Sequence, residues 1–259
     1  MTVPHNAEQM GTGPNTPQEP RRTLVLGTSS MARELAQAYE RLGCETRTGT
    51  VARAGEFDAQ LIATTGDSPD TLAEVAAVAE ETGAEVAPSV SACHHTADRL
   101  AVRKQASEEL GLPTLDYEFA STPQEMQDAI ERIGYPCVVK APTSNDGEGF
   151  SFVRSSADLA NAWSNADRGV GQGAVVERFI DFDFECTILA ARSIDPETGE
   201  LATWFCEPIG TRHREGRLVE AWQPAPLAEG AMDNARSIAA RITGALASCG
   251  VFSIELFVS

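Results

Sequence analysis

The sequence has little positive charge and no long apolar run. Acidic residues number 38 against 20 lysines and arginines, which gives a formal net charge of -18. A surface of this sign repels nucleic-acid phosphates and anionic lipids. No run of about 18 apolar residues, the length needed to cross a bilayer, occurs in the chain. We therefore expect neither nucleic acid nor a membrane as a partner.

Cysteine is sparse and scattered. The six cysteines form no CxxC pair, a usage typical of a reducing cytoplasm in which cysteines mostly serve as small core side chains. His94 and His95 are adjacent, but no cysteine or acidic partner stands at metal-ligand spacing, so a surface turn is a better interpretation than zinc. Residues 1–20 are polar and lack the layout of a signal peptide, which predicts a disordered leader and no export.

Strand and helix patterns alternate in the first third of the chain. Apolar runs predict strands at 23–26, 61–64 and 85–88, with helices after the first two, the second of them at 71–81. The predicted apolar face of the first helix consists of Met31, Leu35, Ala38 and Leu42. Such alternation is typical of a parallel sheet, so we expect a small Rossmann-like α/β domain over residues 21–96.

The rest of the chain, residues 97–259, mixes helices with strands that include antiparallel candidates, which indicates an α+β domain. Helices are predicted at 97–110, at 122–133 with Thr122 as N-cap, at 156–165 and at 228–248. Strands are predicted at 137–140, 147–153, 174–177, 184–191, 203–208 and 251–258.

Several features of this second domain have the chemistry to bind phosphate. Arg99 and Lys140 supply positive charge, and the loop 143–150 supplies glycines and backbone N–H groups. Each signal is weak alone, because a lysine at a strand end is more often a solvated charge and a glycine loop is usually a turn. Their order and spacing make the combination specific.

Read in order, the motifs resemble those of the ATP-grasp family. They are Arg99 with Arg103-Lys104, Leu112-Pro113-Thr114, the string GYPCVVK that ends at Lys140, the glycine loop, Val176-Glu177 and Asp183-Phe184-Glu185. The strings EELGLPTLDYEFA, IGYPCVVKAP, FDFECTIL, REGRLVEAWQP and IELFV look like segments of one family within it, the formate-dependent phosphoribosylglycinamide formyltransferases. The resemblance runs from about residue 22 to the last residue and implies a pre-ATP-grasp domain followed by an ATP-grasp domain.

The resemblance implies a binding site for ATP and Mg²⁺. Arg99 and Lys140 would hold the phosphates, and Glu185 would accept hydrogen bonds from the ribose hydroxyls. Glu255 would be a ligand of Mg²⁺, which prefers carboxylate oxygen and shares itself with substrate phosphates. The lid over the phosphates would consist of Ser144, Asn145, Asp146, Gly147, Glu148, Gly149 and Phe150. The adenine would be lined by Glu177, Arg178, Phe179 and Ile180.

Without the resemblance, these acids have plainer interpretations. Glu177 and Glu185 would be exposed ends of edge strands, and Glu255 would point outward from a core strand. A functional role is hardest to dismiss for Glu255, because this residue lies within an apolar run where an unpaired buried carboxylate would cost several kcal/mol.

The family's reaction, as the resemblance implies it, is an ATP-dependent ligation. ATP phosphorylates formate to formyl phosphate, and the amine of glycinamide ribonucleotide attacks the activated formyl group. Positioning and charge neutralisation lower the barrier, and no covalent protein nucleophile is needed. Ser30, Met31 and Asp67 occupy the places where the family contacts the ribonucleotide, and the resemblance also suggests a homodimer.

The sequence departs from the family pattern in three places. Glu148 stands where the family has a lysine between two glycines, beside Asp146, and like charge near phosphate costs roughly 1–4 kcal/mol. Ser30 replaces a glutamate. The family continues beyond the strand of Glu255 into a second metal-binding glutamate, so the ATP-grasp domain at 97–259 is expected to be incomplete at its C-terminus.

Three functions therefore remain open. The first is the formate-dependent formyltransferase. The second is a truncated or degenerate ATP-grasp module that binds nucleotide without turnover. The third is a related ATP-grasp ligase such as carboxyaminoimidazole ribonucleotide synthetase, although the stretch REGRLVEAWQP argues against it.

Overall fold

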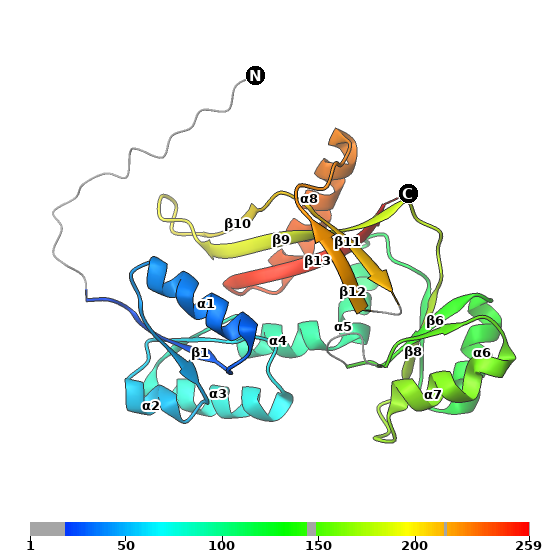
Figure 1. Cartoon of the computed structure of the whole chain (residues 1–259), viewed down its shortest axis with the longest axis horizontal. Coiled ribbons are helices and arrows are strands. Elements are labelled where there is room, and N and C mark those ends of the chain that lie inside the picture. Colours follow the sequence, from blue (N-terminus) through cyan, green and yellow to red (C-terminus); the bar gives the residue numbers. More distant parts are fainter. Residues whose placement is uncertain (1–18, 144–148, 215–216, 259) are drawn as a thin grey trace. The chain divides into compact units, whose positions relative to one another are not determined.

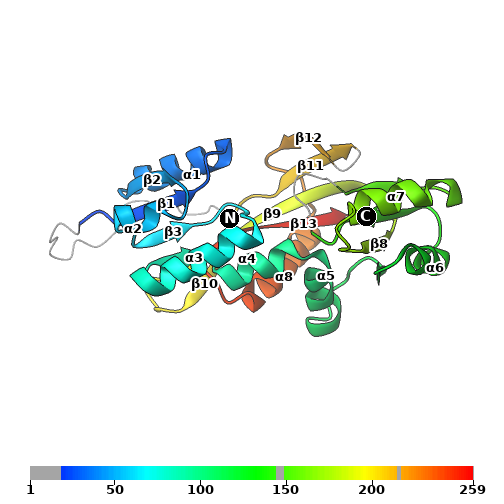
Figure 2. The same ribbon diagram turned by 90° about the horizontal axis from the view of Figure 1, so that it is seen from below.

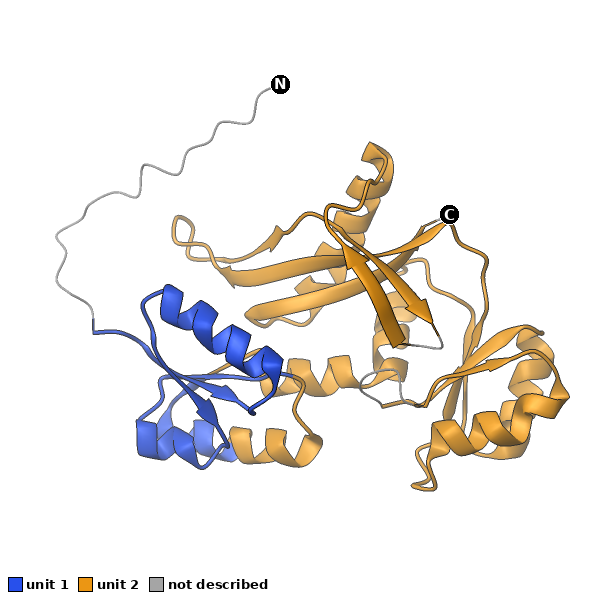
Figure 3. Cartoon of the chain, in the orientation of Figure 1, with its two compact units in different colours: residues 1–65, 77–85 blue, residues 66–76, 86–259 orange. Residues whose placement is uncertain are grey.

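The computed structural model describes residues 19–143, 149–214 and 217–258 (Figure 1). Most of the predicted leader over 1–20, and residues 144–148 of the predicted lid, lie outside the described residues. The chain divides into two compact units, residues 1–65 with 77–85 and residues 66–76 with 86–259 (Figure 3). The division passes through helix α3 (Pro69–Thr82).

A four-stranded sheet with the order β2-β1-β3-β4 forms the first part of the fold. Figure 2 labels its strands β1, β2 and β3. Its strands are β1 (Arg22–Leu26), β2 (Glu45–Gly49), β3 (Leu61–Ala63) and β4 (Glu85–Ala87). β1 pairs in parallel with both β2 and β3, as the alternating pattern predicts. Strand β2 was not predicted, because this edge strand has the polar sequence ETRTG and buries only its last residue. The five-residue helix α2 (Arg53–Phe57) was not predicted either.

The buried face of helix α1 (Ser30–Arg41) differs from the predicted one. Ala32 and Ala36 are buried against β1 and β3, whereas Met31 is 65% exposed and Leu42 is 79% exposed. Alanine lets the helix backbone approach the sheet closely, so the alanine stripe packs inward, with Leu35 packed against it, and Met31 and Leu42 stay outside. The predicted face is therefore right at Leu35 and wrong at Met31 and Leu42, and it omitted the buried Ala32 and Ala36.

The predicted helix at 97–110 is interrupted. Helix α4 (Val90–Ala97) ends at Asp98, whose carboxylate accepts hydrogen bonds from the N–H groups of Leu100 and Ala101 at 2.9 and 3.1 Å and so caps helix α5 (Arg99–Lys104). A π-helical turn, η1 (Gln105–Glu109), follows. His94 and His95 lie within α4, so the predicted surface turn is wrong. The N-cap of this helix is Ser89, whose hydroxyl accepts a hydrogen bond from the N–H of Ala92.

A second sheet is antiparallel and has the order β5-β8-β6-β7. Its strands are β5 (Tyr117–Ala120), β6 (Cys137–Lys140), β7 (Ser151–Val153) and β8 (Ala174–Arg178). Helices α6 (Pro123–Ile133) and α7 (Leu159–Asp167) pack on one face (Figure 2). Cys137, Val139 and Val176 point into that core, so their sequence neighbours Lys140 and Glu177 lie on the opposite face.

A third, five-stranded sheet is built around β9 (Phe184–Ile194). Along one side β9 pairs with β13 (Gly250–Val258), and along the other with β10 (Leu201–Phe205) and β11 (Ile209–Arg214). β12 (Arg217–Trp222) extends the sheet beyond β11. Helix α8 (Glu229–Ala245) covers one face, where Ala235 and Ala239 pack against Ile188, Ala190 and Ile254.

The cysteines differ in their exposure. Cys137 and Cys186 are buried core residues as predicted, but Cys206 is exposed. Over residues 19–143, 149–214 and 217–258, no helix is both long and apolar enough to cross a membrane.

Candidate functional site

A buried carboxylate lies between two cations on the face of the second sheet opposite α6 and α7. The Glu177 side chain is 2% exposed. Its Oε2 accepts a hydrogen bond from Lys140 Nζ at 2.7 Å, and its Oε1 accepts one from Arg103 Nε at 2.9 Å. The β6–β8 register makes Lys140 and Glu177 diagonal neighbours on adjacent strands. Glu177 is therefore not the exposed end of an edge strand: β8 is an interior strand of its sheet.

The charges around Glu177 decide its ionisation. Burial alone would raise its pKa, but the positive charges of Lys140 and Arg103 and their hydrogen bonds outweigh burial and lower the pKa of Glu177 to about 2. Glu177 is therefore ionised at neutral pH. The cluster Arg103–Glu177–Lys140 thus holds two formal positive charges against one negative charge.

Helix α5 meets the segment that follows Lys140. The backbone N–H of Arg99, the first residue of α5, donates to the carbonyl of Pro142 at 2.9 Å. The N–H of Ala141 donates to the carbonyl of Gly149 at 3.0 Å, so the two ends of the loop are joined. The backbone of Arg99 thus lies next to the segment that follows β6. Predicted lid residues Ser144, Asn145, Asp146, Gly147 and Glu148 lie outside the described residues.

Gly149 occupies a place that no other residue fits. Its φ is +73°, and an added Cβ would lie 2.5 Å from the Ala141 Cβ. We expect Gly149→Ala to lower the free energy of unfolding by about 2 kcal/mol more than Gly169→Ala does. Gly169 is the matched control, because its φ is +70° but nothing lies within 4 Å of an added Cβ. Urea denaturation measures both, and equal losses would show that packing at Gly149 is not tight.

Two acids lie together on the third sheet, on the face opposite α8. The β9–β13 register pairs Glu185 with Phe257 and Glu255 with Thr187, so the two glutamates are diagonal neighbours. Glu255 is exposed, while Phe252 and Ile254 point toward α8. The burial cost expected for Glu255 does not arise, because β13 alternates and its acid is on the outer face.

Glu185 has a partner that the sequence analysis missed. Its carboxylate Oε2 and the Nδ1 of His213 form a short hydrogen-bonded pair, with side chains that are 18% and 26% exposed. β11 places Thr211 opposite Glu185, and an irregularity in the β11–β12 register between Arg212 and His213 accompanies this contact. Only the recognition of β11 as a neighbour of β9 could have revealed the pair.

The residues predicted to line adenine have different surroundings. The guanidinium of Arg178 donates to Asp116 at 2.7 Å in an exposed ion pair. Phe179 is 41% exposed and contacts Phe152 edge to face, with ring centroids 4.9 Å apart. These two rings, together with Phe150, line a cavity of about 570 Å³. Ile180 is half-buried in the segment that connects β8 to β9.

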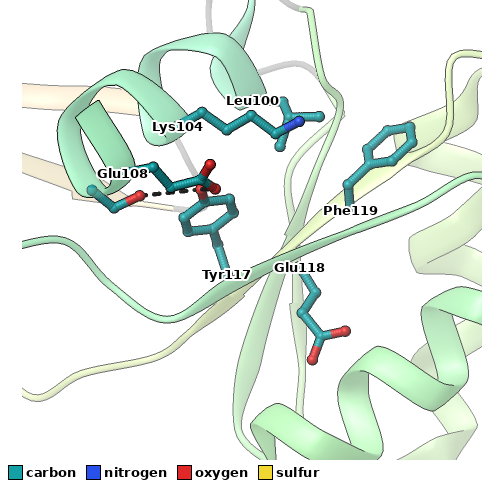
Figure 4. Close-up of a pocket in the computed structure, with 7 residues that line it drawn as sticks. Leu100, Lys104, Glu108, Tyr117, Glu118 and Phe119 are labelled. Carbon is teal, nitrogen blue, oxygen red and sulfur yellow. Dashed lines mark hydrogen bonds between the residues drawn. The ribbon is translucent and has the colours of Figure 1, made fainter.

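A second cavity lies between α5 with η1 and the edge strand β5 (Figure 4). Its volume is about 440 Å³. The Tyr117 hydroxyl contacts Ser107 and Glu108 there, each at 3.2 Å. The residues that line it are Leu100, Lys104, Ser107, Glu108, Tyr117, Glu118 and Phe119, and none of them is a predicted site residue.

The residues predicted to bind a ribonucleotide follow two neighbouring parallel strands. Ser30 and Met31 begin the helix after β1, and Asp67 lies in the loop after β3. The hydroxyl of Thr65 donates to the Leu26 carbonyl at 3.2 Å, which ties the ends of the two strands together. The strand order β2-β1-β3-β4 changes direction here, and open α/β sheets bind ligands at such points.

The acids of the third sheet provide part of a coordination shell for Mg²⁺, and a bound nucleotide has to provide the rest. In the part of the chain that the structure describes, no three His, Cys, Asp or Glu side chains are grouped closely enough to hold a metal. Glu255 and Glu185 offer two carboxylates on adjacent strands. Mg²⁺ commonly completes its coordination with water and substrate phosphates, so this donor set fits Mg²⁺ that arrives with a nucleotide.

The fold and these residues define a protein class. Residues 105–259 match the model of the ATP-grasp domain, so the chain belongs to the ATP-grasp family. The formate-dependent phosphoribosylglycinamide formyltransferase of Corynebacterium efficiens is 42% identical over 94% of this chain and 68% of its own length. That of Burkholderia pseudomallei is 39% identical over 96% of this chain and 69% of its own length. Within the ATP-grasp class, the chain belongs with these formyltransferases.

Solved structures agree with this assignment. One described as "glycinamide-RNase-transformylase T" from Mycobacterium tuberculosis matches with a TM-score of 0.73 and 29% identity, over 92% of this chain and 70% of that one. Carboxyaminoimidazole ribonucleotide synthase of Aspergillus clavatus, complexed with ATP, gives 0.77 at 18% identity, over 92% and 66%; at this identity the likeness concerns the fold alone. The predicted fold class, an N-terminal Rossmann-like domain followed by an ATP-grasp domain, is confirmed, and this fold implies ATP binding.

Proposed function

We propose that this protein is an ATP-dependent formyltransferase of purine synthesis, which transfers the formyl group of formate to the amine of glycinamide ribonucleotide. The observation that carries the proposal is the 42% identity, over 94% of the chain, to a formate-dependent phosphoribosylglycinamide formyltransferase. The placement of Lys140 and Glu177 on one sheet face, and of Glu185 and Glu255 on another, supports it.

In this proposal, residues of both the second and the third sheet bind Mg²⁺-ATP. Lys140 and Arg99 bind the phosphates. Phe179 and the backbone of 178–180 contact the adenine, because the Arg178 side chain is paired with Asp116 and the Glu177 side chain is buried between Lys140 and Arg103. Glu185 binds the ribose, and Glu255 binds the Mg²⁺ that accompanies the nucleotide.

The reaction needs two bond exchanges. An oxygen of formate attacks the γ-phosphorus of ATP while the bond to the ADP oxygen breaks, which gives formyl phosphate. The amine of glycinamide ribonucleotide then attacks the formyl carbon, phosphate leaves with the electron pair of the C–O bond, and the nitrogen loses a proton. Lys140 and Arg99 stabilise the negative charge on the transferring group, and bound Mg²⁺ supplies further charge neutralisation. Ser30, Met31 and Asp67 position the ribonucleotide.

The test is a coupled assay of ADP release. Release that requires both formate and glycinamide ribonucleotide supports the proposal. Release with bicarbonate and aminoimidazole ribonucleotide instead would favour a carboxyaminoimidazole ribonucleotide synthetase. ATP binding without release under either condition would favour a module that binds nucleotide without turnover. Formyl phosphate is trapped by added hydroxylamine, which separates the first step from the second.

The resemblance also supports a homodimer in the cytoplasm. Sedimentation equilibrium of the purified chain would then give about twice the chain mass of 27.6 kDa. A mass equal to that of one chain at micromolar concentration would contradict the proposed dimer and leave the enzymatic proposal unaffected.

The proposed ribose contact predicts a specific loss. We expect Glu185→Gln to weaken ATP binding by about tenfold and dATP binding by about threefold, because a charged acceptor of two ribose hydroxyl hydrogen bonds becomes a neutral one. Glu220→Gln is the matched control: Glu220 lies on β12 in an exposed ion pair with Arg212. Calorimetric titration measures both nucleotides, and an unchanged ratio of ATP to dATP affinity would place the ribose elsewhere.

A further inference from the structure

The proposed phosphate ligand already has a partner inside the protein. Lys140 Nζ donates to Glu177 at 2.7 Å, and the Glu177 side chain is 2% exposed. A lysine whose ammonium is neutralised by a buried carboxylate attracts phosphate weakly, because the pair has no net charge. The site therefore needs a second cation near Glu177 if Lys140 is to act on a triphosphate.

Arg103 is placed to be that cation. Its Nε donates to Oε1 of Glu177 at 2.9 Å, whereas Lys140 uses Oε2, so the two cations do not compete for one oxygen. The Arg103 side chain is 26% exposed and the Lys140 side chain is 19% exposed, so Lys140 remains accessible at one side. The positive charge left over in the cluster is one unit.

We propose that Arg103 is a positioning residue of the nucleotide site, which neutralises Glu177 and leaves the charge of Lys140 to the phosphates. The proposal rests on the proposed function, because it assumes that Lys140 binds the triphosphate. It assigns Arg103 no contact with ATP.

The position of Arg103 on α5 fits this role. Arg103 lies one helical turn after Arg99, whose N–H holds the Pro142 carbonyl at 2.9 Å. One short helix is thereby linked to the segment after Lys140 and to the carboxylate on β8. The low pKa of Glu177, about 2, agrees with two cations acting on it together.

The experiment measures Mg²⁺-ATP affinity by calorimetry on the full chain with Arg103→Met, Arg103→Lys and the double variant Arg103→Met/Glu177→Gln. We expect a loss of about tenfold in Arg103→Met, since Lys140 then becomes the sole partner of Glu177. Arg103→Lys keeps the charge and should stay within about threefold of wild type. The double variant should return to within about threefold as well, because no carboxylate then competes for Lys140.

Controls separate charge from folding. Arg132→Met removes an arginine from an exposed ion pair with Glu118, and should leave ATP binding unchanged. Thermal unfolding of each variant is recorded, so that affinity is compared only among folded proteins. If Arg103→Met destabilises the fold, the double variant still tests the proposal, because it removes the uncompensated carboxylate with its partner.

The outcomes are distinct. Loss in Arg103→Met with recovery in the double variant supports the proposal. Wild-type affinity in Arg103→Met, or a double variant as weak as the single one, overturns it while leaving the proposed function intact. A wild-type chain that does not bind Mg²⁺-ATP at all overturns both.

Discussion

Replacing Lys140 by methionine is expected to weaken Mg²⁺-ATP binding by about 10- to 100-fold. The substitution keeps most of the unbranched side chain on β6 but removes the ammonium, and charge-assisted hydrogen bonds contribute roughly 1.5–3 kcal/mol each. Arg103 still neutralises Glu177 in this variant, since its hydrogen bond is made to the other carboxylate oxygen. Isothermal titration calorimetry measures the change.

A matched lysine controls for net charge. Lys104 is exposed on α5, one residue after Arg103, and Lys104→Met makes the same substitution away from Glu177. We expect Lys104→Met to bind Mg²⁺-ATP within about twofold of wild type. Wild-type affinity in Lys140→Met, with both variants folded, would remove Lys140 from the phosphate site.

Glu177→Gln is expected to lower the free energy of unfolding at pH 7 by roughly 3 kcal/mol, because it leaves two partly buried cations without their carboxylate. The effect depends on pH in a definite direction. The pKa of Glu177 is lowered from 4.5 to about 2 in the folded state, so its ionised form stabilises the fold above pH 4.5. This contribution diminishes as the pH falls from 4.5 toward 2, and the difference between wild type and Glu177→Gln should shrink over that range.

Urea denaturation of both proteins at pH 7, 5 and 3.5 measures this difference. Glu220→Gln, which removes an exposed carboxylate from its ion pair with Arg212, should cost less than about 1 kcal/mol. A difference between wild type and Glu177→Gln that stays constant down to pH 3.5 would mean that the carboxylate is not held ionised by its two cations.

Buried apolar strands could be predicted from the sequence, and exposed ones could not. The prediction for 137–140 coincides with β6, because each of its first three residues is apolar and buried. β12, by contrast, is exposed along its whole length, and the edge strand β2 buries one residue. A strand that buries few side chains shows little apolar alternation in its sequence. Its position is set by the strands with which it pairs, and these are not visible in the local sequence.

The site residues also differ in how far the sequence alone could indicate them. Lys140, Glu177 and Glu185 could be proposed as site residues from the sequence, because they stand at the ends of apolar strands in family motifs. Arg103 and His213 were given no role, because their partners are 74 and 28 residues away in the sequence and only the fold brings them together. For Glu255 the apolar neighbours left both a buried and an outward-pointing carboxylate open, and strand alternation points it outward.

The most direct test is a crystal structure of the chain with Mg²⁺ and a non-hydrolysable ATP analogue. We predict phosphate oxygens within hydrogen-bonding distance of Lys140 Nζ and ribose hydroxyls at the Glu185 carboxylate, with Arg103 still on Glu177. A nucleotide bound away from Lys140, for instance in the cavity of Lys104 and Phe119, would contradict the account.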